Sequence, residues 1–218
     1  MSKTCYYCNS EATTVEHIPP KNLFPAIHEL GIDFRKNLIT VPSCEEHNNK
    51  KSNSDERLRQ ILVGSGLTNK IGQALLPSKW KRSFERSPKL LRDEIFQGKR
   101  VKYMSEEDTE YQVGILAKIN FEEIDDLLIK ICSGLYYNET GKKLTGSPFL
   151  ITGFTIYLNK LQQKTNEIEL SKVRKFFSSS KCIGENPEVF YYNRRFNSNI
   201  ITFLLVFYEY NEVLVRFY

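Results

Sequence analysis

Four side chains with metal-binding chemistry stand in two short motifs near the N-terminus. Cys5 and Cys8 have the C-x-x-C spacing by which two thiolates of one knuckle bind a single ion. Cys44 and His47 are three residues apart, so at the start of a helix they project from neighbouring positions on one face. Together the four supply a Cys3His set, which is typical of a closed, structural zinc site. Two unrelated pairs of buried residues are the alternative.

A second group of polar residues lies between and after the two halves of this motif. Glu16 and His17 form an acid–imidazole pair in EHIPP, and Asn37 and Asn48 follow in NL and HNNKK. Taken alone, an acid beside a histidine is most simply a satisfied surface pair. Its position between the halves of a zinc motif favours a site that does chemistry.

The order of these motifs resembles the HNH endonuclease superfamily, the ββα-metal nucleases. The resemblance covers residues 5–56: C-x-x-C, an acid–histidine pair followed by proline, Asn-Leu, and a helix start of the form C-x-x-(ligand)-N-x-x-K. It implies that His17 is the general base and that Glu16 and Asn48 bind a catalytic divalent ion. Asn37 would brace the loop that positions the base. The string EHIPPKNLFP…NLITVPSC is also similar to bacterial HNH proteins that carry a C-terminal extension.

Two positions depart from the family pattern. The family usually has Asp where Glu16 stands, so this carboxylate must reach the metal with one extra methylene group. The fourth zinc ligand is usually Cys, and here it is His47, which leaves a role at the catalytic ion open. The zinc role is preferred because the spacing from Cys44 replaces the usual cysteine and brings Asn48 into register.

The resemblance implies hydrolysis of phosphodiester bonds, with DNA as the expected substrate and phage defence as a family-level role. A neutral imidazole can take a proton from water near neutral pH, and Mg²⁺ or Mn²⁺ stabilises the developing negative charge. A non-catalytic zinc module that recognises nucleic acid or protein is the main rival. A nuclease subunit that needs a protein partner, such as an ATPase, is a third hypothesis.

Positive charge is concentrated in one segment of the 218-residue chain, whose net charge is +5. Residues 70–103 hold ten basic and three acidic side chains, the composition that a polyanion-binding surface needs. A solvated helical face would have the same composition, and Trp80 with Phe84 fits the buried edge of such a helix. The candidate phosphate contacts are Lys51, Lys79, Lys81, Arg82 and Arg86.

The elements that must position these residues form an α+β pattern. Strands are expected over 12–18 and 37–41, followed by a helix over 44–62 that Ser43 and Glu46 would start as a capping box. GSG at 64–66 then separates an HNH module, residues 1–66, from an accessory α+β region, residues 67–218. In that region the expected elements are a strand pair at 100–104 and 111–119, helices over 120–137 and 165–178, a strand over 150–158, and a C-terminal antiparallel meander.

Composition also limits which cellular compartment and which kinds of partner are expected. The longest apolar run, residues 200–208, falls far short of the roughly 20 residues of a membrane span, so no membrane partner is expected. The N-terminus lacks the apolar core of a secretion signal, which favours the cytoplasm. Five cysteines, an odd number, argue for metal binding or burial rather than for disulfides.

Overall fold

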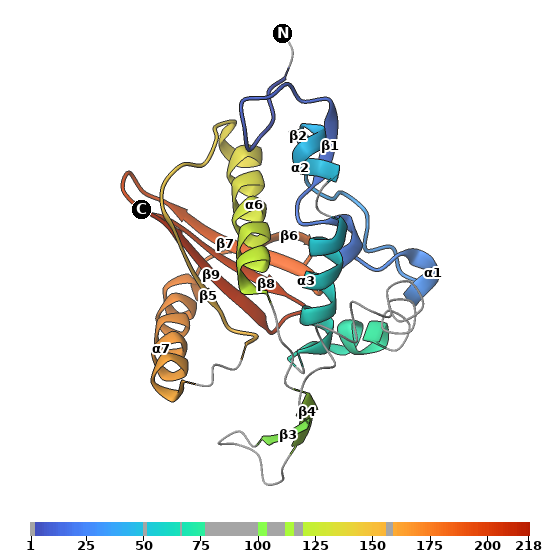
Figure 1. Cartoon of the computed structure of the whole chain (residues 1–218), viewed down its shortest axis with the longest axis vertical. Helices are drawn as coiled ribbons and strands as arrows, with labels where there is room; N and C mark the ends of the chain where they lie inside the picture. Colours follow the sequence, from blue (N-terminus) through green and yellow to red (C-terminus); the bar gives the residue numbers. More distant parts are fainter. Residues whose placement is uncertain are drawn as a thin grey trace.

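A computed structural model gives the fold of the chain (Figure 1). It describes residues 3–49, 52–65, 67–76, 100–103, 112–115, 120–155 and 159–218. Within these ranges the chain combines helices with antiparallel sheets, as the sequence predicts. The candidate phosphate contacts Lys51, Lys79, Lys81, Arg82 and Arg86 lie outside the described residues.

The N-terminal part contains a two-stranded antiparallel sheet followed by helix, so the expected strand–strand–helix order is confirmed. In the sheet Thr14 stands opposite Ser43 and His17 opposite Thr40. The second strand begins three residues later than predicted, because Asn37 adopts a left-handed backbone conformation (φ 52°) that interrupts an extended chain. The elements are β1 (Thr14–His17), η1 (Lys21–Leu23), α1 (Ile27–Leu30), β2 (Thr40–Ser43), α2 (Glu45–Asn49) and α3 (Ser52–Gly64).

The C-terminal part is dominated by a five-stranded antiparallel sheet with strand order β5-β9-β8-β7-β6. Its last four strands follow one another along the chain as neighbours, which confirms the predicted meander. A separate hairpin pairs β3 with β4, also as predicted. The strands are β3 (Arg100–Tyr103), β4 (Gln112–Ile115), β5 (Pro148–Thr152), β6 (Ile183–Asn186), β7 (Phe190–Phe196), β8 (Ile201–Phe207) and β9 (Asn211–Phe217).

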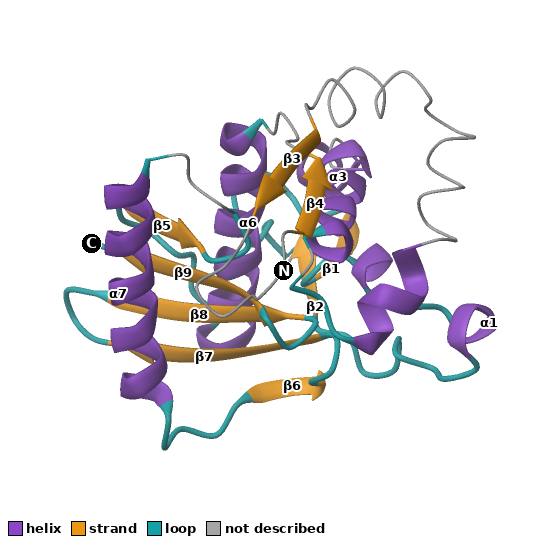
Figure 2. Cartoon of the chain, turned by 90° about the horizontal axis from the view of Figure 1, so that it is seen from below, coloured by secondary structure: helices purple, strands orange, loops and turns teal. Residues whose placement is uncertain are grey.

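Both faces of this sheet are covered, which explains why β8 is apolar without interruption from Phe203 to Phe207. Phe203, Leu205 and Phe207 point to the face that packs against α6 (Phe121–Thr140). The alternating residues Leu204 and Val206 belong to the cluster formed with α7 (Lys160–Phe177). Figure 2 shows α7 crossing the strands.

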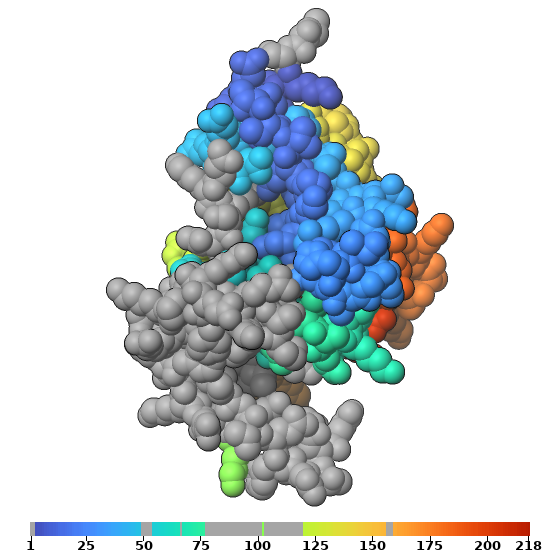
Figure 3. All heavy atoms as spheres, turned by 90° about the vertical axis from the view of Figure 1, so that its right-hand side faces the viewer, coloured from blue at the N-terminus to red at the C-terminus, as the bar shows by residue number. Residues whose placement is uncertain are grey.

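The hairpin of β1 and β2 packs into the same hydrophobic core as α6 and the sheet. Ile18, which is 1% exposed, lies against Gly134 of α6, where an added Cβ would come within 2.5 Å of the isoleucine side chain. The hydroxyl of Tyr208 donates to the carbonyl oxygen of Leu23 at 2.5 Å. In Figure 3 the blue N-terminal residues abut the orange atoms of the C-terminal region. Described residues on both sides of residue 66 therefore share one core.

Within the described ranges, no helix combines the length and the apolar character needed to cross a bilayer.

Candidate functional site

Three thiols and one imidazole converge near the N-terminus, as the two sequence motifs predict. The ligand atoms of Cys5, Cys8, Cys44 and His47 all lie within 4.8 Å of one another. Cys8 Sγ lies 3.7 Å from Cys44 Sγ, and His47 Nδ1 lies 3.1 Å from Cys44 Sγ and 3.9 Å from Cys5 Sγ. All three cysteines are free thiols rather than disulfide partners.

These distances suit a single tetrahedral ion. Zinc bonds of about 2.3 Å to sulfur and about 2.0 Å to nitrogen place neighbouring ligand atoms roughly 3.5–3.8 Å apart. The cluster can therefore hold a metal ion such as zinc, and four protein ligands would leave no open position for catalysis. His47 lies with the three cysteines, which favours its zinc role over a role at a second ion.

The two halves of the cluster are held by separate backbone contacts. The Cys5 amide donates to the Ser10 carbonyl oxygen at 2.9 Å and closes the knuckle, and the Tyr6 amide donates to the Pro42 carbonyl oxygen at 2.8 Å, which fixes the knuckle to β2. The thiols differ in their surroundings. A hydrogen bond with the Ser10 side chain lowers the pKa of Cys8, whereas burial raises that of Cys44.

Helix α6 and the loop after it also position the knuckle. The Lys143 ammonium donates to the Cys8 carbonyl oxygen at 2.6 Å and to Asn9 Oδ1 at 2.7 Å. The ring of Tyr7 lies 4.9 Å from the His47 imidazole, and Lys130 Nζ sits 5.7 Å from the centre of the Tyr7 ring. The C-terminal part therefore contributes directly to the shape of the metal cluster.

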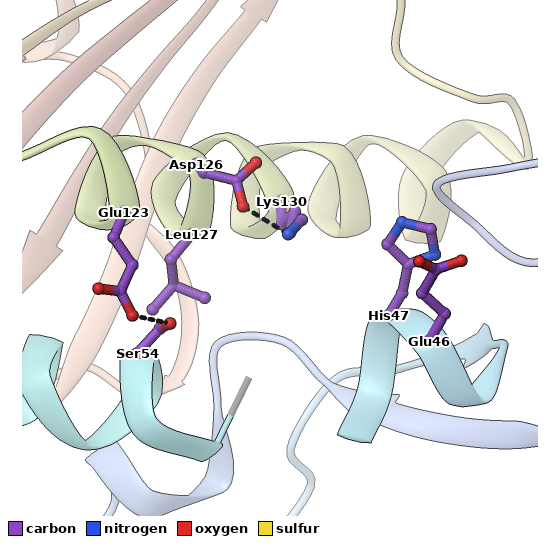
Figure 4. Close-up of a pocket in the computed structure, with 7 residues that line it drawn as sticks. All are labelled: Glu46, His47, Ser54, Glu123, Asp126, Leu127 and Lys130. Carbon is purple, nitrogen blue, oxygen red and sulfur yellow. Dashed lines mark hydrogen bonds and ion pairs between the residues drawn. The ribbon is translucent and has the colours of Figure 1, made fainter. Parts of the chain in front are cut away.

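Figure 4 shows a pocket of about 190 Å³ between α2, α3 and α6, with His47 and Glu46 at one end. Its acidic side chains are engaged with neighbours. Glu123 accepts a hydrogen bond from Ser54 and forms an ion pair with Arg57, and Asp126 pairs with Lys130 on the same helix. These contacts join α6 to α3, so we assign the pocket a structural role.

Glu16 is a buried carboxylate with two hydroxyl partners. Its side chain is 6% exposed and accepts a hydrogen bond from Ser43 Oγ at 3.3 Å. Tyr6 lies between the two knuckle cysteines in the sequence, and its hydroxyl also forms a hydrogen bond with the Glu16 carboxylate. Burial, together with the charge of Glu16, raises the pKa of Tyr6. Ser43 thus serves Glu16, and α2 begins at Glu45 rather than from the expected capping box of Ser43 and Glu46.

His17 follows Glu16 on β1 and is half-buried. Because successive side chains of a strand point to opposite faces, the imidazole is directed away from the Tyr6–Ser43 side of the sheet. Burial lowers the pKa of His17 below its usual value, and the nearby cations Lys21 and Arg35 lower it further, while Glu16 acts in the opposite direction. The imidazole is therefore neutral near pH 7 and available as a proton acceptor.

Asn48 brings α2 to the same strand. Its amide nitrogen donates to the Val15 carbonyl oxygen at 3.4 Å, one residue before Glu16, which leaves the amide oxygen for another partner. The fold thus brings Asn48 to the strand that carries Glu16 and His17, whose side chains point to opposite faces of the sheet. A carboxylate and an amide oxygen are the donor types that a hard divalent cation takes, so the residues fit such an ion by type.

Asn37 lies just before β2, at the end of the two-stranded sheet where His17 stands opposite Thr40. It is exposed, and its backbone is in the left-handed region that asparagine tolerates better than most residues. It lines a second pocket, of about 240 Å³, together with Ile18 and Pro19, which follow His17. The Ile18 amide donates to the Ile39 carbonyl oxygen at 2.9 Å. Asn37 thus belongs to the loop beside the base, and its bracing role stays a prediction.

Sequence reasoning missed four residues around this site. Tyr6 was given no role and Ser43 was expected to cap a helix, and only the folded chain shows that both hydroxyls bind Glu16. Lys21 and Arg35 stand in no motif, and the larger basic segment after residue 70 is the stronger charge signal in the sequence. The one available signal was the position of Lys21, four residues past His17 and just after two prolines.

Comparison with protein-family models, with curated proteins and with solved structures finds no match to this chain.

Proposed function

We propose that this protein is a metal-dependent endonuclease of the HNH type that hydrolyses phosphodiester bonds in nucleic acid. The observation that carries the proposal is the joining of α2 to β1 by Asn48 and Val15, beside a Cys3His cluster that fixes the same helix. The contact supports the proposal because it joins the helix that carries Asn48 to the strand that carries Glu16 and His17.

In the proposed reaction His17 is the general base. A water molecule loses a proton to the neutral imidazole while its oxygen forms a new bond to phosphorus. The bond from phosphorus to the 3′-oxygen breaks, and that oxygen takes up a proton from solvent. The products are a 5′-phosphate and a 3′-hydroxyl end.

Glu16 and Asn48 would hold the catalytic ion, Mg²⁺ or Mn²⁺, through their side-chain oxygens. When bound, such an ion neutralises negative charge on the phosphoryl oxygens and on the departing oxygen. The Ser43 and Tyr6 hydroxyls keep the Glu16 carboxylate oriented, and the Val15 carbonyl oxygen fixes the amide group of Asn48. The Cys3His cluster, with zinc, would serve as the structural anchor of both elements.

DNA is the substrate that the family resemblance favours, and phage defence is the role that it suggests. Both are proposals at the level of the family. The basic side chains at Lys51, Lys79, Lys81, Arg82 and Arg86 add sequence-independent phosphate contacts in this proposal, and partners such as an ATPase subunit would act through the C-terminal part.

The test is cleavage of plasmid and of single-stranded DNA and RNA with Mg²⁺, Mn²⁺ or chelator, comparing the wild type with His17→Ala and His28→Ala. His28 is the matched control because it is an exposed histidine on α1, away from the motif. We expect His17→Ala to lose about 10²- to 10⁴-fold in rate with its zinc content unchanged, and His28→Ala to cut normally. Equal cutting by the wild type and His17→Ala would refute the assignment of the base.

A non-catalytic zinc module remains the second candidate, because the burial of Glu16 between two hydroxyls also fits a purely structural carboxylate. In that case the wild type binds nucleic acid or a protein without divalent-ion-dependent cleavage. Cleavage that appears only when a partner protein is co-expressed would identify a nuclease subunit instead.

A further inference from the structure

Two cationic side chains, those of Lys21 and Arg35, belong to the loop between β1 and β2, which begins directly after His17. Lys21 belongs to η1, which follows His17 after two prolines, and Arg35 comes from the loop that leads back to β2. Both lie close enough to act electrostatically on the imidazole. They come from the first 49 residues, whereas the basic segment identified in the sequence begins at residue 70.

The guanidinium of Arg35 is held in place by the protein itself. Its Nε donates to the Phe24 carbonyl oxygen at 2.9 Å, and its backbone amide donates to Asp33 Oδ1 at 3.0 Å. Phe24 directly follows η1, and its amide donates to the Lys21 carbonyl oxygen at 3.1 Å. The two cations therefore sit on one small hydrogen-bonded unit of the loop between β1 and β2.

Neither cation is neutralised by a carboxylate within the described part of the chain. The ion pairs there involve other lysine and arginine side chains, and Asp33 is engaged through the backbone of Arg35 rather than through its guanidinium. The nearest acid along the strand, Glu16, is buried and accepts hydroxyl hydrogen bonds. Two positive charges on one hydrogen-bonded loop, neither paired with a carboxylate among the described residues, form a site for an anion.

We propose that Lys21 and Arg35 bind the non-bridging oxygens of the phosphodiester whose hydrolysis His17 assists. This inference rests on the proposed nuclease function and extends it. Arg35, with Nε fixed on Phe24, presents its terminal nitrogens as a preoriented fork for two phosphate oxygens, and Lys21 adds a mobile point charge. The pair selects a phosphate by its charge and has no means of reading a base.

The experiment compares Lys21→Gln and Arg35→Gln with Lys36→Gln. Lys36 is the matched control, because it is an exposed lysine that stands next to Arg35 in the sequence. We expect kcat/KM to fall about 10- to 1,000-fold for Arg35→Gln, by less for Lys21→Gln, and to stay unchanged for Lys36→Gln. Arg35→Lys, which keeps the charge but loses the fork, should recover part of the activity.

A substrate with an uncharged phosphate analogue distinguishes a direct contact of Arg35 with the phosphate from a purely structural role of Arg35. A duplex with a methylphosphonate at the mapped cleavage position has lost the charge that the pair would bind. If Arg35 touches that phosphate, the methylphosphonate slows the wild type more than it slows Arg35→Gln. If the rate reductions caused by Arg35→Gln and by the methylphosphonate simply multiply, Arg35 does not contact that phosphate and the inference is overturned. A loss of activity in Lys36→Gln equal to that in Arg35→Gln would overturn it as well. Both outcomes leave the nuclease proposal intact.

A different result would show that the protein is not a nuclease. A wild type that cuts no nucleic acid with any metal overturns the proposed function, and binding then decides the role of the pair. We would measure fluorescence anisotropy of a labelled oligonucleotide against salt concentration. A phosphate contact predicts that each substitution reduces the salt slope by about one, and that Lys36→Gln does not. Equal slopes in all variants would rule out the anion site.

Discussion

Ser43 Oγ donates to Glu16 Oε2 at 3.3 Å across two paired strands, so the last residue of β2 orients the acid that precedes the proposed base. Tyr6 brings a second hydroxyl to the same carboxylate from within the metal knuckle. The carboxylate thus links three pieces of chain: the knuckle, β1 and the junction with α2. Its burial makes these hydroxyls important for stability as well as for orientation.

We therefore expect Ser43→Ala and Tyr6→Phe each to reduce the free energy of unfolding by about 1–3 kcal/mol, the cost of removing one partner from a buried polar group. Urea unfolding of the metal-loaded protein measures this change. Tyr210→Phe is the control for the loss of a hydroxyl, because Tyr210 is 60% exposed. Stability unchanged in both variants would show that solvent reaches Glu16 and replaces the hydroxyls.

Metal binding is expected to depend on the four clustered residues and on no other cysteine among those described. Cys8→Ser and Cys44→Ser should release zinc and unfold the N-terminal part, since structural zinc in small modules contributes about 10–16 kcal/mol. Cys182→Ser, which changes an exposed thiol outside the cluster, should retain the ion. Metal analysis of the purified variants checks this, and zinc retained in both cluster variants would contradict a four-ligand site.

The contact of Ile18 with Gly134 predicts a steric effect across the interface. Gly134→Ala should reduce stability by about 1–3 kcal/mol, because its Cβ would stand 2.5 Å from Ile18 Cγ1 and 2.7 Å from Cδ1. Ile18→Val removes Cδ1, so the double variant should lose less than the two single changes combined. Strictly additive losses in urea unfolding would show that the two residues do not press on each other.

Tyr208→Phe tests the hydrogen bond that ties the sheet to η1. It removes the donor to the Leu23 carbonyl oxygen, a buried acceptor, and should reduce stability by about 1–3 kcal/mol, again with Tyr210→Phe as the control. Burial raises the pKa of Tyr208 above its usual value near 10. This group therefore contributes stability that is present below pH 10 and lost at higher pH, as the unfolded chain releases its proton. Unfolding curves at pH 8 and pH 11 should show a smaller alkaline loss for Tyr208→Phe than for the wild type.

Local patterns predicted much of the fold. The apolar stripe from Phe121 to Leu135 predicted α6, which extends from Phe121 to Thr140. Boundaries were less accurate where a single side chain decides them. Helix α7 begins at Lys160, five residues earlier than expected, because Asn159 Oδ1 caps it by accepting from the Leu161 and Gln162 amides.

The candidate site shows where sequence reasoning ends. The two halves of the Cys3His cluster were predictable because ligand spacing is a local property. The contact of Tyr208 with Leu23 joins residues 185 positions apart, and no local pattern encodes it. The same holds for Arg35, whose place beside His17 depends on how the intervening loop folds back onto Phe24.

The close approach of Ile18 to Gly134 also bears on how this chain can change over generations. A gene that kept only the first quarter of the sequence would encode a hairpin whose apolar underside faces water. Recombination at residues 64–66 would therefore separate apolar surfaces that pack against each other in one core. The parts of the chain before and after these residues should be inherited together.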